Sequence, residues 1–97
     1  MLLTFHKSNN ILRATLTDDL GALVTSATVT VTIKDKAGTS LVTGASMPEV
    51  GSGEYEYNIS NILLPTEDEI YRGEVTAVKS GNTRYAEIPF KNILDVD

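Results

Sequence analysis

Apolar and polar residues alternate with a period of two along most of this chain, and that period restricts it to extended backbone. The clearest example is "ATVTVTIKDKAG" at 27–38. One side of this stretch holds Ala27, Val29, Val31 and Ile33, and the other holds Thr28, Thr30, Thr32 and Lys34. Successive side chains of a strand point to opposite faces, so the pattern predicts a strand with one buried face. Threonine suits the outer face because its branched Cβ favours extended backbone while its hydroxyl tolerates water.

The same alternation recurs in several other segments, which predict further strands and a shared core. These segments are 11–19, 53–60, 70–78 and 85–90, and a strand can also resume at 39–42 after the first example. Turn-forming residues gather between them at 18–23, 35–38, 51–53 and 79–82. The inward positions predict a core of Leu12, Ala14, Leu16, Val29, Val31, Ile33, Tyr55, Tyr57, Ile59, Tyr71, Val75, Ala77, Ile88 and Phe90.

No helical apolar stripe competes with these strands in the sequence. The nearest candidate, 61–70, is interrupted by Pro65, although one helical turn there stays open. Residues 80–82 favour a tight hairpin in which Gly81 takes a positive φ. Pro89 has no N–H to donate, so the last strand is expected at a sheet edge or with a bulge. We therefore predict an all-β chain with a single domain over 1–97, an antiparallel β-sandwich of about seven strands.

Composition excludes several classes of function. The 97 residues include no cysteine, so neither disulfides nor thiolate chemistry is expected. Thirteen acidic residues against eight basic ones give a net charge of −5, which argues against partners such as nucleic acid or an anionic membrane. "MLLTFHKSNN" has no apolar run of signal-peptide length, so we expect no signal peptide and synthesis in the cytoplasm.

Residues that could carry catalysis are sparse. His6 is the only histidine and there is no cysteine, so a nucleophile–histidine triad and a zinc site are not expected. Glu54 with Glu56, or the run at 67–69, could suggest paired catalytic carboxylates, but an acidic surface is the better interpretation. We predict that the chain is not an enzyme and needs no cofactor.

Two weaker ligand hypotheses remain on the sequence alone. Calcium needs only oxygen ligands, and these could come from Asp18, Asp19 and Asp35 if they share one end of the sandwich. The simpler interpretation is that all three are solvated aspartates in turns. An aromatic platform for a sugar would need exposed rings. Most tyrosines fall on the inward register, and Tyr85 is the least certain of the set.

Residues 11–90 resemble bacterial and viral immunoglobulin-like domains. The similarity lies in "ATVTVTIKD", in "GEYEY" and in "YRGEVTAVKSGN", and it is closest to small free-standing proteins encoded among the structural genes of tailed bacteriophages. The resemblance implies an immunoglobulin-like sandwich located in the virion, a structural component of the head–tail junction or the capsid surface. Its implied partners are other virion proteins (capsid, portal, connector or tail) and copies of itself. Tandem adhesin repeats differ because they occur on long chains with secretion signals.

Two functions from different classes remain: a non-enzymatic structural virion subunit, or a recognition module that binds carbohydrate or a host surface. For the first, apolar residues outside the core register are the candidates for partner binding. They are Leu2, Leu3 and Phe5 at one end, and Ile93, Leu94 and Val96 at the other. The alternative is that the first set forms a strand of the chain's own sheet and the second closes the sandwich.

Overall fold

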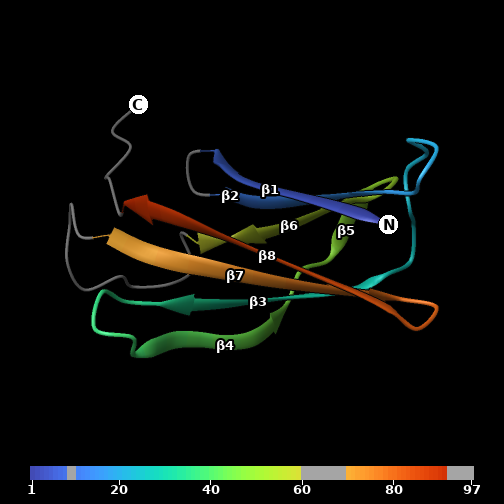
Figure 1. Cartoon of the computed structure of the whole chain (residues 1–97). Helices are drawn as coiled ribbons and strands as arrows, with labels where there is room; N and C mark the ends of the chain where they lie inside the picture. Colours follow the sequence, from blue (N-terminus) through green and yellow to red (C-terminus); the bar gives the residue numbers. More distant parts are fainter. Residues whose placement is uncertain (9–10, 60–69, 92–97) are drawn as a thin grey trace.

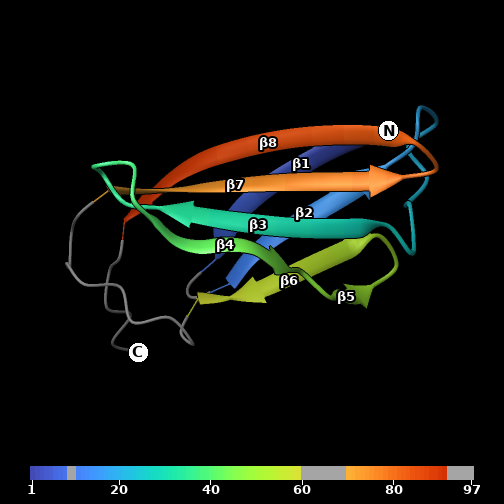
Figure 2. The ribbon, with the colours of Figure 1, turned by 90° about the horizontal axis from the view of Figure 1, so that it is seen from below.

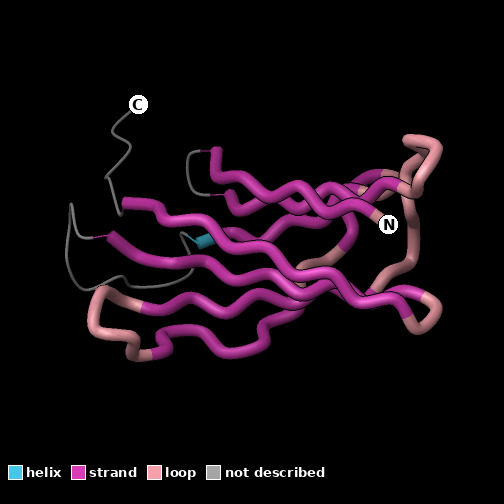
Figure 3. The backbone as a smooth tube through the Cα atoms, viewed as in Figure 1, coloured by secondary structure: helices cyan, strands magenta, loops and turns pink. Residues whose placement is uncertain are grey.

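The computed structural model describes residues 1–8, 11–59 and 70–91 of the chain. Over these residues the protein is all-β, and Figure 3 shows that strands make up most of it. The strands are β1 (Leu2–Ser8), β2 (Ile11–Thr17), β3 (Thr28–Lys34), β4 (Ser40–Ser46), β5 (Glu49–Gly51), β6 (Glu54–Asn58), β7 (Ile70–Lys79) and β8 (Asn82–Lys91). No helix within the described ranges has the length and apolar character needed to cross a membrane.

The strands form two four-stranded sheets that lie face to face (Figures 1 and 2). One sheet has the order β1-β2-β6-β5 and the other β4-β3-β7-β8, and every pairing is antiparallel. The predicted antiparallel β-sandwich is therefore confirmed. The short strand β5 was not predicted, because three residues are too few for an alternation to be recognised in the sequence.

The core lies between the sheets and closely matches the predicted set. Twelve of its fourteen predicted residues are buried, whereas Tyr57 and Ile88 are only partly buried and pack against the others. Tyr57 lies beyond the point where β5 stops pairing with β6, and Ile88 lies on the edge strand β8. Each therefore lacks a neighbouring strand on one side. Met47 is buried although it was not predicted, since it lies between β4 and β5, outside any alternating segment.

The two predicted features of the last hairpin are also confirmed. Ser80 and Gly81 join β7 to β8 with φ angles of 50° and 80°, which corresponds to the two-residue turn that matches the twist of paired strands. β8 pairs with β7 alone, so Pro89 lies on an edge strand. There its missing N–H costs the sheet little.

Val31 and Val75 test the core directly, because they are fully buried and face one another across β3 and β7. Replacing either by alanine is expected to lower the free energy of unfolding by about 1–3 kcal/mol, the usual cost of a small cavity. Thr30→Ala, on the outer side of β3, should change it by less than about 0.5 kcal/mol. Urea unfolding measures all three, and equal losses for Thr30→Ala and Val31→Ala would contradict the assigned faces.

Candidate functional site

The N-terminal residues predicted to bind a partner belong to strand β1 of the chain's own sheet. β1 pairs with β2 from Leu2 opposite Thr17 to Ser8 opposite Ile11. Leu3 and Phe5 are partly buried and pack against the core, whereas Leu2 is 61% exposed. Of this set, Leu2 is therefore the residue best placed to contact another molecule. Ile93, Leu94 and Val96 lie outside the described residues, as does the acidic run at 67–69.

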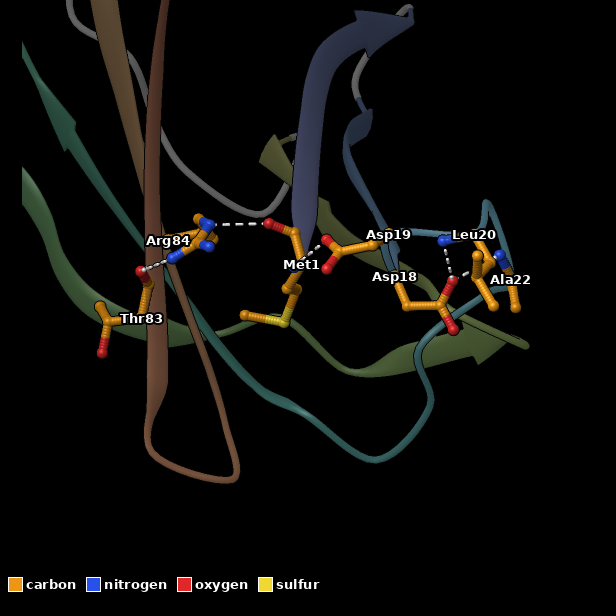
Figure 4. A network of polar contacts seen from close by, with 7 residues as sticks. All are labelled: Met1, Asp18, Asp19, Leu20, Ala22, Thr83 and Arg84. Carbon is orange, nitrogen blue, oxygen red and sulfur yellow. Dashed lines mark hydrogen bonds and ion pairs between the residues drawn. The ribbon is translucent and has the colours of Figure 1, made fainter.

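A polar network joins the start of β1 to strand β8 of the other sheet and to the β2–β3 loop (Figure 4). Arg84 on β8 donates from Nε to the Met1 carbonyl oxygen at 2.7 Å and from Nη1 to the Thr83 carbonyl at 2.9 Å. The α-amino group of Met1 lies 3.4 Å from Asp19 Oδ1. Since β1 and β8 lie side by side at one edge of the sandwich, this network links the two sheets there.

The loop between β2 and β3 is held in shape by Asp18. Its Oδ1 accepts hydrogen bonds from the backbone N–H groups of Leu20 at 2.8 Å and Ala22 at 2.9 Å (Figure 4). Its own N–H donates to the Ala22 carbonyl at 2.8 Å. Asp35 acts in the same way in the β3–β4 turn, where it accepts from Ala37 and Thr39. Both aspartates thus act as turn residues.

The suggestion that Asp18, Asp19 and Asp35 share one end of the sandwich is wrong. The β2–β3 loop precedes β3 and the β3–β4 turn follows it, so they lie at opposite ends of this strand. Figure 1 shows them at opposite ends of the molecule. The part of the chain that the structure describes contains no group of three or more His, Cys, Asp or Glu residues able to hold a metal ion. A calcium site built from these three carboxylates is therefore not possible within one copy.

Metal removal provides a test of these turn aspartates. Chelation is expected to leave the melting temperature unchanged, because each carboxylate is used by backbone N–H groups. Asp18→Ala should lower the free energy of unfolding by about 1 kcal/mol because two hydrogen bonds are lost, and the loss should be the same with or without calcium. Thermal unfolding followed by circular dichroism measures both effects. A large drop in melting temperature on adding chelator would contradict the structural role.

Glu56, one of the two carboxylates on β6, is paired with Arg13. Glu56 lies opposite Arg13 in the β2–β6 register and accepts hydrogen bonds from both Nε and Nη2 of its guanidinium. Both hydrogen bonds go to Oε2 of Glu56, and such a charge-assisted pair favours the ionised carboxylate. His6 lies in β1, where it is opposite Arg13 in the register with β2.

Tyr85 on β8 is the exposed aromatic residue that the sequence left uncertain. Its side chain is 55% exposed on the outer side of β8, and its hydroxyl donates to Glu87 Oε2 at 2.9 Å. This hydrogen bond, together with desolvation and the nearby Glu74 carboxylate, raises the pKa of the Tyr85 hydroxyl above its ordinary value. Tyr85 is therefore a neutral hydroxyl at physiological pH.

Four large apolar side chains of the β1-β2-β6-β5 sheet and the β2–β3 loop are exposed near one end of the sandwich. They are Leu2 at the start of β1, Leu20 and Leu23 in the β2–β3 loop, and Val50 in β5, which we call the apolar end. Leu20 is the most exposed of them, at 94%. Sequence reasoning missed Leu20 and Leu23 because both lie in a segment recognised only for its turn formers. The sequence did contain one sign of Leu20: it is a leucine among the turn formers of "DDLG", where no predicted strand would bury it.

A hollow of about 470 Å³ lies at the opposite end, beside the β3–β4 turn. Its lining includes Lys34, Lys36 and Arg72 around the apolar side chains of Ile70 and Pro89. Lys34 forms an ion pair with Glu74 at 3.4 Å. Sequence reasoning missed this basic cluster because only the pairing of Lys34 with Arg72 across β3 and β7 brings its members together.

The sequence matches no model of a known protein family, and no curated protein is similar to it.

Proposed function

We propose that this chain is a non-enzymatic structural subunit of a tailed-phage virion, acting at the head–tail junction or on the capsid surface. The observation that carries the proposal is the apolar end. Leu2, Leu20, Leu23 and Val50 expose large apolar side chains at the same end of the sandwich, and Leu2 and Leu23 both lie beside Thr17. Apolar side chains exposed together on a small domain favour protein–protein contact. The partners would be other virion proteins and further copies of the chain.

The strand order supports an immunoglobulin-like topology. In that fold the strands A, B, E and D form one sheet, and C, F and G form the other, which can extend beyond C. The observed order β1-β2-β6-β5 against β4-β3-β7-β8 corresponds to A-B-E-D against C′-C-F-G. This correspondence supports the resemblance to phage immunoglobulin-like proteins that the sequence suggests.

A recognition module is the second candidate, and one observation favours it. Tyr85 presents an exposed ring on β8, and a hydroxyl held by Glu87 could order that ring against a sugar. A platform of this kind would normally need a second exposed aromatic ring. Carbohydrate binding abolished by Tyr85→Ala would favour this candidate over the structural one.

The proposed function is tested by separating folding from incorporation into particles. Leu2→Ser changes an exposed side chain of the apolar end, and deletion of 92–97 removes the second set of predicted contact residues. Thr30→Ala is the matched control, on the outer side of a central strand. We expect at least one of the two changes to keep the fold by circular dichroism but reduce the amount of chain in purified particles. Normal incorporation of both would contradict the proposed contacts.

A further inference from the structure

The tip of the β2–β3 loop has the features of a docking element. Leu20 is 94% exposed, and the neighbouring Asp19 side chain is 96% exposed although it lies 3.4 Å from the α-amino group of Met1. The loop is closed by the Asp18 hydrogen bonds and by the Gly21 N–H, which donates to the Asp18 carbonyl at 3.1 Å. A loop that is already ordered loses little conformational entropy when it binds.

The hollow at the other end has complementary chemistry. Ile70 and Pro89 offer apolar contact, and Lys34, Lys36 and Arg72 make the lining basic. In the part of the chain that the structure describes, neither Lys36 nor Arg72 has an ion-pair partner. The one acidic lining residue, Asp35, uses its carboxylate for the β3–β4 turn. The hollow can therefore accept an apolar side chain with a carboxylate beside it.

We propose that the β2–β3 loop of one copy docks in the basic hollow of the next copy, with Leu20 against Ile70 and Pro89 and Asp19 facing Lys36 and Arg72. The loop and the hollow lie at opposite ends of a molecule whose longest extent is 40 Å, so they cannot meet within one copy. The occupant is a second copy because this chain itself carries the complementary loop. The inference rests on the proposed assembly function and adds the surfaces that join the copies.

A contact between two different surfaces of the same chain is heterologous, and it produces rings or open chains of subunits. Each copy offers one loop and one hollow, so assembly continues through both ends. Blocking one surface leaves the other intact, which makes the geometry testable with pairs of variants.

The experiment is sedimentation velocity on the full chain across concentrations from micromolar to about millimolar. Wild-type protein should form species larger than a dimer as concentration rises. Leu20→Ser removes the apolar tip and Lys36→Glu reverses one charge of the hollow, and each should weaken association at least about tenfold, as expected for residues central to an interface. Tyr85→Ser, exposed on the side of the sandwich, is the matched control and should associate like wild type. Circular dichroism should show that all three variants fold.

A mixture of the two variants distinguishes this geometry from other contacts. The Leu20→Ser chain keeps an intact hollow and the Lys36→Glu chain keeps an intact loop, so an equimolar mixture should form dimers and stop there. With ¹⁵N label on the Leu20→Ser chain, amide shifts should change around Lys36 and Arg72. A wild-type chain that stays monomeric, a Leu20→Ser chain that associates like wild type, or a mixture without dimers would overturn this inference. None of these results affects the proposed function, which fails only if the chain is absent from particles.

Discussion

Replacing Tyr55 by alanine is expected to destabilise the domain by about 3–5 kcal/mol, the usual range for a large aromatic residue in a core. Tyr55 is one of the two largest fully buried side chains, and it lies on the inward side of β6. Its hydroxyl also links β6 to the β2–β3 loop, because it accepts from the Ala27 N–H at 3.0 Å and donates to the Val24 carbonyl at 3.1 Å. The substitution thus removes core volume and two hydrogen bonds together.

Tyr55→Phe separates the two contributions. It keeps the ring but leaves the Ala27 N–H and the Val24 carbonyl without their partner, which should cost about 1–3 kcal/mol. Tyr57→Phe, on a partly buried residue of the same strand, is the control and should cost less. Urea unfolding of the three variants gives the comparison. If Tyr55→Phe is as stable as wild type, the hydroxyl does not anchor the loop.

Replacing Gly53 by alanine is expected to cost about 2–4 kcal/mol for two separate reasons. Gly53 has a φ of +74°, which side chains other than glycine adopt with strain. A Cβ there would also lie 2.8 Å from Leu23 Cβ and 3.1 Å from the Leu16 carbonyl oxygen. The Gly53 carbonyl accepts from the Leu16 N–H at 2.9 Å, so the backbone cannot move away without losing that bond.

Gly81→Ala is the matched control for this prediction. Gly81 has a similar φ of +80°, but nothing lies within 4 Å of the position its Cβ would take. Gly81→Ala should therefore lower the free energy of unfolding by about 1 kcal/mol, through backbone strain alone. Chemical unfolding of both variants tests the difference. Equal losses would mean that the β2–β3 loop shifts freely to admit a methyl group over Gly53.

The core was predictable because it depends on a local property, the alternation of side chains along a strand. Val31, Leu12 and Tyr55 each lie in a segment where that alternation is unbroken. Ile88 follows the same alternation, yet it is only partly buried, whereas Phe90 on the same edge strand is buried. Alternation alone does not show how completely each inward position is covered. Met47 is buried through tertiary packing at a position that no local pattern marks.

The candidate surfaces were less predictable because they depend on which ends of the sandwich come together. Asp18 and Asp35 look alike in sequence, yet they belong to the β2–β3 loop and the β3–β4 turn, which the antiparallel path of the chain places at opposite ends. Lys34 and Arg72 are distant in sequence, and only the pairing of β3 with β7 makes them neighbours. Leu20 appeared to be one more turn residue, and its near-complete exposure could not be inferred from its neighbours.

We propose that this chain works by occupying a place in a virion. Quantitative mass spectrometry of purified virions, from the phage that we propose as its source, tests this proposal most directly. We expect the chain to be retained through purification at a fixed ratio to the major capsid protein, in more than one copy per particle. Absence of the chain from purified particles, despite its abundance in the infected-cell lysate, would contradict it.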